Sequence, residues 1–151
     1  MDIGRFETAI HLPDSGQQFP AAGGDVGYAR LVTTGSEPLT LVEFTSEDRE
    51  WLPSHSHPWE ELIYVLDGEL DFVVGSLSQR GGAGTIQALP KGVPHSLRVP
   101  QGSARFLMIT LGAPSLPFLR EVGQAYAGGP TLERLHEVAA RHGVHPEQQP
   151  G

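Results

Sequence analysis

The chain between residues 28 and 112 is divided into seven short apolar runs, and no other feature of the sequence constrains its fold as strongly. Glycine, proline or aspartate separates the runs, and β-branched and aromatic residues are common within them. Runs of this length and spacing are typical of antiparallel strands rather than of helices. The sequence therefore predicts an all-β sandwich or barrel, with strands at 28–34, 39–45, 61–66, 69–75, 84–89, 95–99 and 104–112.

The dipeptide Asp67-Gly68 lies between two of these runs and predicts a tight hairpin that joins them. In the second run Leu70, Phe72 and Val74 alternate with acidic residues, which gives that strand one apolar face.

The pattern changes after residue 113, where the spacing of apolar residues becomes helical. A short helix fits 114–126, and a second helix fits the residues between Thr131, a good N-cap, and Gly143, a good terminator. We therefore expect four parts: an N-terminal segment at 1–25, a barrel at 26–112, a helical segment at 113–145 and a tail at 146–151.

Composition excludes several classes of function. The 151 residues suit one domain, and the net charge of −8 with scattered basic residues argues against nucleic acid as a partner. There is no cysteine, so the chain has no disulfide and no thiolate ligand. The N-terminus has no signal-peptide pattern, and no apolar run approaches the ~18 residues of a membrane-spanning helix. We expect a cytoplasmic protein with no membrane partner.

The segment PSHSHPWEE, residues 53–61, holds the first candidate site. Residues i and i+2 of a strand project from the same face, so His55 and His57 can present two imidazoles side by side. Glu61 follows closely enough to add a carboxylate, whereas Glu60 points the opposite way. Two histidines and a carboxylate suit a borderline divalent metal, although a solvated polar loop would have the same sequence.

A third histidine, His95, ends the segment GTIQALPKGVPH at 84–95. Proline fixes φ at Pro90 and glycine permits a tight turn at Gly92, so the backbone that leads into His95 is well determined.

With this second segment the sequence resembles the cupin superfamily. The first cupin motif is matched by His55, His57, Glu61 and Gly68, and the second by Gly84, Pro90, Gly92 and His95. Two positions depart from the motifs: Arg49 replaces the leading glycine, and Val99 replaces the usual asparagine. The likeness covers about residues 38–111. The local sequences HSHPWEELIYVLDGELDF and LPKGVPHSLRV resemble single-domain bacterial cupins of the quercetin 2,3-dioxygenase-like type.

The resemblance implies a small antiparallel cupin barrel of the jelly-roll type, with one or two short C-terminal helices. It also implies one divalent metal ion (Fe, Ni, Mn, Cu or Zn) held by His55, His57, Glu61 and His95. Such a set leaves one or two positions for water, substrate or O2. In this family Glu61 would have a second role as proton acceptor.

Apolar residues near the motif are candidates for a substrate pocket. If residues 51–57 form one strand, Trp51 shares the face of His55, while Ile63 and Val65 share that of Glu61. Together with Phe72 they can form an apolar wall beside the metal. Plain core packing explains each of them equally well.

The resemblance implies a metal-dependent dioxygenase acting on an oxygenated aromatic or enolisable small molecule. The same four ligands serve a non-oxidative polyketide cyclase or an isomerase, in which the metal acts as a Lewis acid. A non-catalytic small-molecule binding protein is the third alternative. The family also implies a homodimer, often formed by N-terminal strands that pack on the neighbour's sheet, so segment 1–25 is a candidate dimer contact. The outward apolar positions Leu62, Tyr64 and Leu66 would then need cover. Packing against the C-terminal helices is an equal alternative for these three residues.

Overall fold

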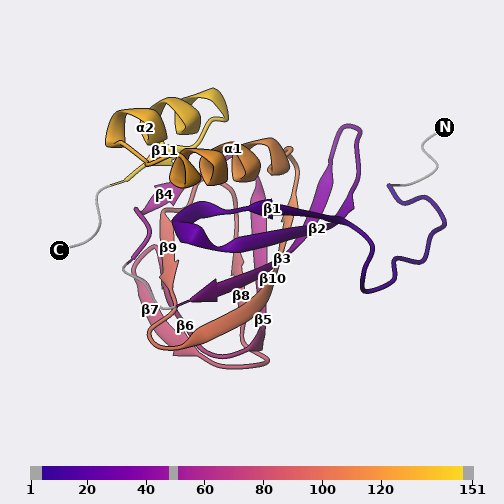
Figure 1. The fold of residues 1–151 in the computed structure, drawn as a ribbon, viewed down its shortest axis with the longest axis horizontal. Coiled ribbons are helices and arrows are strands. Elements are labelled where there is room, and N and C mark those ends of the chain that lie inside the picture. The colour runs from indigo at the N-terminus through magenta and orange to yellow at the C-terminus, as the bar shows by residue number, and fades with distance from the viewer. Residues whose placement is uncertain (1–4, 48–50, 148–151) are drawn as a thin grey trace.

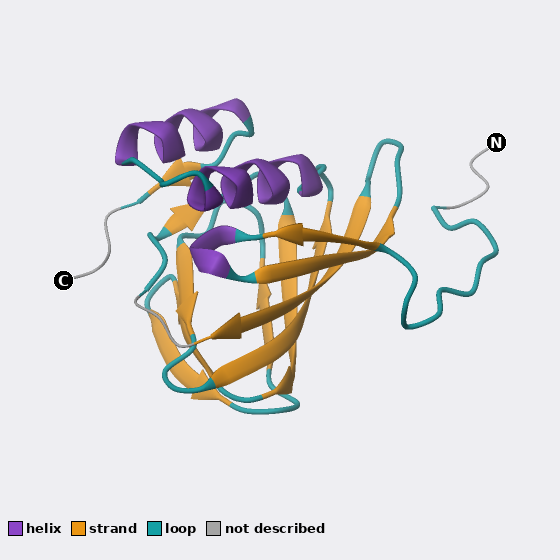
Figure 2. Ribbon diagram, in the orientation of Figure 1, coloured by secondary structure: helices purple, strands orange, loops and turns teal. Residues whose placement is uncertain are grey.

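A computed structural model describes residues 5–47 and 51–147 of the chain, and its main body is two facing antiparallel sheets (Figures 1 and 2). The first sheet has the strand order β1-β2-β3-β10-β5-β8 and the second β11-β4-β9-β6-β7. The strands of the first sheet are β1 (Gln17–Pro20), β2 (Val26–Val32), β3 (Leu39–Glu47), β10 (Ser103–Leu111), β5 (Glu60–Asp67) and β8 (Ile86–Leu89). Those of the second are β11 (His145–Pro146), β4 (His55–Ser56), β9 (His95–Arg98), β6 (Leu70–Val74) and β7 (Leu77–Gly81).

All seven predicted strands are present, and the all-β prediction is confirmed. The predicted hairpin at Asp67-Gly68 is wrong, because β5 and β6 belong to different sheets and do not pair. Gly68 instead turns the chain from one sheet to the other with φ +78°, and a Cβ there would lie 2.2 Å from the carbonyl oxygen of Ser103. The true hairpin joins β6 to β7, a strand that the sequence did not predict.

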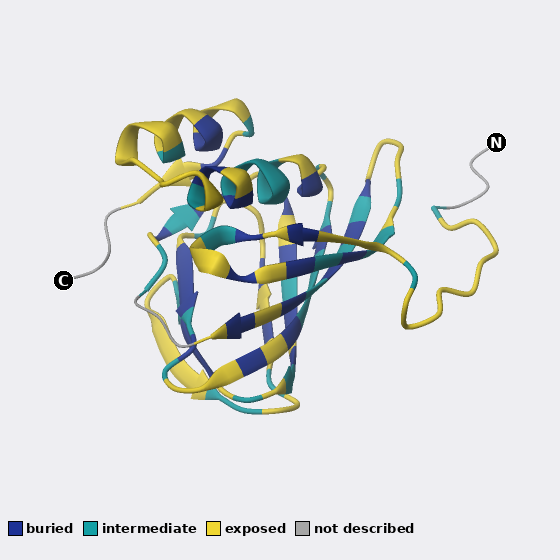
Figure 3. Ribbon diagram, in the orientation of Figure 1, coloured by how far each residue is buried: buried dark blue, intermediate teal, exposed yellow. Residues whose placement is uncertain are grey.

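The core lies between the two sheets, where the inward positions of both are apolar (Figure 3). On β5 the side chains of Ile63 and Val65 are fully buried, and on β6 Leu70 and Phe72 are buried with them. On β5 burial alternates as expected from the sequence, whereas on β6 Asp71 is buried together with Leu70 and Phe72, and Val74 is only half-buried.

Two helices cover one end of the barrel, α1 (Leu116–Ala127) and α2 (Leu132–Arg141) (Figure 1). The hydroxyl oxygen of Thr131 accepts a hydrogen bond from the backbone N–H of Arg134, so the predicted N-cap is confirmed. A Cβ at Gly123 would lie only 1.8 Å from the carbonyl oxygen of Pro20. Helix α1 therefore packs backbone against backbone on the segment between β1 and η1 (Ala22–Gly24).

Residues from the N- and C-terminal segments pair with strands of the two sheets. β1 lies in the predicted N-terminal segment and pairs with β2 of its own chain. Pro146, assigned to the tail by the sequence, pairs with His55 of β4, and the backbone N–H of Glu147 donates to the carbonyl oxygen of Ser54. Of the helices in the described part of the chain, none has the length and apolar character needed to span a membrane.

Leu62, Tyr64 and Leu66 lie on the outer face of the first sheet, and Tyr64 is 39% exposed. The main helix contacts in the described residues are with β1, η1 and β11, so the helices do not supply the cover for this face. The homodimer stays a prediction.

Candidate metal centre

His55 and His95 lie on neighbouring strands, and His57 directly follows the strand of His55. His55 on β4 is directly opposite His95 on β9, and their ring centroids are 4.5 Å apart. The ring of His57 lies 4.6 Å from that of His95. The backbone N–H of Gly92 donates to the carbonyl oxygen of His57 at 2.9 Å, which ties the Pro-x-Gly turn to the HxH segment.

Each of the three imidazoles has one nitrogen engaged by the backbone two residues away. Nδ1 lies 2.9 Å from the carbonyl oxygen of Pro53 for His55, 3.0 Å from that of Trp59 for His57, and 2.8 Å from that of Val93 for His95. A carbonyl only accepts, so Nδ1 carries a proton in all three residues, and Nε2 keeps its lone pair wherever the imidazole is neutral. This pattern orients histidines that bind metals.

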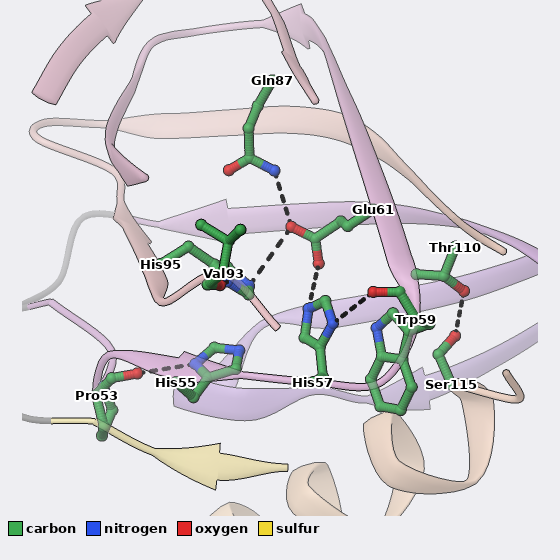
Figure 4. Close-up of polar contacts among 10 residues, drawn as sticks. All are labelled: Pro53, His55, His57, Trp59, Glu61, Gln87, Val93, His95, Thr110 and Ser115. Carbon is green, nitrogen blue, oxygen red and sulfur yellow. Dashed lines mark hydrogen bonds and ion pairs between the residues drawn. The ribbon is translucent and has the colours of Figure 1, made fainter. Parts of the chain in front are cut away.

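The Nε2 atoms of His57 and His95 lie beside the carboxylate of Glu61, which is outside the group formed by the three histidines (Figure 4). One ligand nitrogen from each histidine lies within 4.8 Å of the others, so the three histidines can hold a metal ion. Glu61 Oε1 lies 3.3 Å from Nε2 of His57, and Oε2 lies 3.7 Å from Nε2 of His95. Glu60 is exposed on the other face, as the sequence predicts.

The arrangement fits a cation. With Nδ1 protonated, the Nε2 atom of a neutral imidazole is an acceptor, and so is a carboxylate oxygen. Two buried acceptors at 3.3 Å repel each other unless a proton or a metal ion lies between them. Nitrogen and carboxylate donors together match the preference of first-row divalent metals.

The electrostatics keep His55, His95 and Glu61 deprotonated at neutral pH. Burial, helped by His95, lowers the pKa of His55 to about 4, and burial also lowers the pKa of His95. Burial alone raises the pKa of Glu61, but the hydrogen bond with His57, the neighbouring imidazoles and the amide of Gln87 together lower it to about 2. Metal binding needs neutral imidazole and ionised carboxylate, so little proton release accompanies it at neutral pH.

We expect the metal-free protein to lose stability as the pH falls from about 6.5 to about 4. Unfolded His55 titrates near 6.5 and folded His55 near 4, so between these values the unfolded chain binds more protons. Glu61 acts with the same sign, and its contribution is lost as the pH falls from 4.5 through about 2. Urea unfolding at pH 7.5 and at pH 5 measures the effect, and a His55→Gln variant should show a smaller difference. Equal differences in the two proteins would contradict this origin.

An apolar cavity of about 170 Å³ adjoins the candidate centre. The wall is mostly apolar, and its polar lining residues include Asp25, Ser54, His55, Glu61, His95, Ser96 and His136, whereas His57 is not part of the described lining. The roof comes from α1 and α2, with the residues Phe118, Leu119, Val122, Tyr126, Leu132, Leu135, His136 and Ala139. Apolar walls with a few polar groups are typical of small-molecule sites.

The residues predicted to line a pocket lie elsewhere. Ile63, Val65 and Phe72 are buried in the core cluster and are not among the described cavity-lining residues. Trp51 precedes β4, is half-buried, and stacks under the guanidinium of Arg98 at 5.0 Å from the ring centroid. The strand parity does not extend back to Trp51, because β4 contains only two residues and Pro53 interrupts the chain before it.

Two residues that the sequence reasoning did not select support the site. Trp59 stacks on His57 with 4.6 Å between ring centroids and contacts Phe118 of α1, so it connects the candidate ligand to the roof. Gln87 donates to Glu61. The available signal for Gln87 was its position in IQAL, where a polar residue shares the parity of the buried Leu89.

Residues 42–110 match the protein-family model described as "Cupin domain". Among solved structures, an RmlC-like cupin from Shewanella frigidimarina is 18% identical, with 71% of this chain and 93% of that chain covered and a TM-score of 0.61. The polyketide cyclase RemF from Streptomyces resistomycificus is 24% identical, with 86% and 99% covered and a TM-score of 0.57. The Fe(II) form of HppE is 18% identical, with 73% and 62% covered and a TM-score of 0.54.

At these identities the structural likenesses establish the fold. A comparison with curated protein sequences finds no match. The family match and the cupin barrel together support placing residues 42–110 in the cupin superfamily.

Proposed function

We propose that the protein is a metal-dependent enzyme that acts on an oxygenated aromatic or enolisable small molecule. The observation that carries this proposal is that His55, His95 and Glu61 line the wall of one mostly apolar cavity. A substrate with an apolar body and one oxygenated end suits such a space. The likeness to the Fe(II) form of HppE is consistent with a metal in a barrel of this shape.

The proposed ligands are His55, His57, His95 and Glu61. A divalent metal in this site would polarise a substrate oxygen and, if it is Fe, Ni, Mn or Cu rather than Zn, would support reaction with O2. The three backbone carbonyls hold the imidazoles in one tautomer, and the apolar walls exclude water from the reacting end.

Glu61 is the proposed proton acceptor. With its pKa at about 2 it is ionised but a weak base while it contacts the imidazoles and Gln87. If the carboxylate turns away from these partners, burial becomes the dominant effect and raises its pKa. A turn toward the cavity would therefore make Glu61 a stronger base beside the substrate.

Ring-opening dioxygenation is the reaction that we expect first. Both oxygen atoms of O2 enter the product in such a reaction, so it needs no external reductant. A non-oxidative cyclisation is the second candidate, supported by the similarity to RemF, which extends over 86% of this chain and 99% of that one.

We expect oxygen uptake when a flavonol such as quercetin is added to protein loaded with Fe(II), Ni(II), Mn(II) or Cu(II), and none with Zn(II). An oxygen electrode and product analysis measure the reaction, and the His57→Ala protein is the control. Turnover of a poly-β-carbonyl substrate without oxygen uptake, including with Zn(II), would instead support the cyclase. Tight binding of either substrate without turnover under any metal would support a binding protein and contradict the enzyme proposal.

A further inference from the structure

Gln87 is a polar residue that is buried on β8, next to an apolar residue that is exposed. On β8 the apolar Ile86 is exposed, whereas Gln87 is only 6% exposed. A buried amide is less favourable than an apolar side chain unless its polar groups are hydrogen-bonded. The contacts of Gln87 therefore indicate why an amide stands at this position.

One end of the amide is engaged and the other is not. Nε2 of Gln87 donates to Oε2 of Glu61 at 2.8 Å, from β8 to the paired strand β5 (Figure 4). The reverse orientation of the amide would set its oxygen against the carboxylate, so the contact fixes the assignment. The carbonyl oxygen, Oε1, is buried without a hydrogen-bond partner among the described residues. The N–H donor is therefore the part of the Gln87 amide that makes a hydrogen bond within the described residues.

The donor distinguishes the two oxygens of Glu61. Oε2 accepts the amide hydrogen bond and lies 3.7 Å from Nε2 of His95, whereas Oε1 lies 3.3 Å from Nε2 of His57. We infer that Gln87 is a positioning residue that holds Glu61 by Oε2, so that Oε1 alone serves as the ligand oxygen. The inference rests on the proposed metal site and adds which carboxylate atom completes it.

Without the amide, the carboxylate of Glu61 would be free to rotate about its last bond. It could then turn away from His57 and toward the cavity that Glu61 also lines. Replacing a residue that hydrogen-bonds to a metal ligand commonly lowers metal affinity by about 10–100-fold.

The test is Gln87→Met, which keeps the length of the side chain and removes the donor. Affinities for Zn(II) and Co(II) are measured by chelator competition, and the visible absorption of the Co(II) protein reports the ligand geometry. We expect affinity to fall about tenfold and the Co(II) spectrum to change, with the circular dichroism of the wild type retained. Gln79→Met is the matched control, because Gln79 is exposed and its amide contacts only the carbonyl oxygen of Arg80 among the described residues.

A double-mutant cycle separates positioning from general packing. In a Glu61→Gln background, Gln87→Met should cause no further loss of affinity, because the carboxylate on which it acts is absent. An equal loss in both backgrounds overturns the inference, as does wild-type affinity with an unchanged Co(II) spectrum in Gln87→Met. Gln87→Leu is a second replacement, and failure of both variants to fold would assign Gln87 a structural role and overturn the inference as well. If the wild type itself binds no metal, the proposed function falls together with this inference.

Discussion

Replacement of His57 by alanine is expected to remove the metal from the protein. His57 is 3% exposed, its Nε2 lies 3.3 Å from Glu61, and its ring lies 4.6 Å from the rings of both Trp59 and His95. Loss of a residue that only hydrogen-bonds to a ligand lowers metal affinity by about 10–100-fold, so loss of a ligand itself should lower it by more than about 100-fold. Metal analysis of protein purified without added metal measures the effect.

The control for this experiment is His11→Ala. His11 is exposed and lies in the N-terminal segment, away from the strands of the centre. The His11→Ala protein should keep its metal at the wild-type ratio. Unchanged metal content in folded His57→Ala protein would show that His57 is not a ligand and would remove the basis of the proposed function.

Replacement of Trp59 by alanine is expected to destabilise the metal-free protein by about 3–5 kcal/mol, the usual cost of truncating a buried aromatic residue. Trp59 is 2% exposed and packs with Ala139 and Val144 in a second apolar cluster under the helices. Its ring also stacks on His57 and contacts Phe118. Urea denaturation at pH 7.5 measures the change in the free energy of unfolding.

Trp51→Ala provides the comparison, since Trp51 is half-buried and its ring contact is with the guanidinium of Arg98. Trp51→Ala should lower the free energy of unfolding clearly less than Trp59→Ala does. Metal affinity should fall less in Trp59→Ala than in His57→Ala, because the carbonyl oxygen that holds Nδ1 of His57 belongs to the backbone and is retained. A loss of stability below about 1 kcal/mol in Trp59→Ala, well short of the expected truncation cost, would contradict the role of this cluster.

The sequence predicts the strands well, because alternation and turn residues follow local rules, and the three histidines singled out in the sequence lie together in the structure. Alternation along β5 separates Glu61 from Glu60, and the Pro-x-Gly turn places His95 opposite His55. The hairpin at Asp67-Gly68 fails for a non-local reason. A dipeptide favours a reversal of the chain but does not determine which strands pair after it, and here Gly68 leads from one sheet to the other.

The cavity lies beyond what local patterns reveal. Its wall combines β-barrel residues with helix residues more than 60 positions further along the chain, such as His55 with Phe118. The apolar face of the first helix was visible in the sequence, but the surface that it covers depends on the close approach of Gly123 to Pro20. Parity alone placed Ile63, Val65 and Phe72 inward, and inward positions of a barrel serve the core as readily as a pocket.

The short strand β4 carries His55 and is held on one side by β11, which follows the roof helix α2. A metal ion on β4 and a molecule beneath the roof therefore act on one connected unit of the fold. Coupling between two binding events is reciprocal. If the metal makes the cavity bind its molecule tenfold more tightly, that molecule must make the protein hold its metal tenfold more tightly as well.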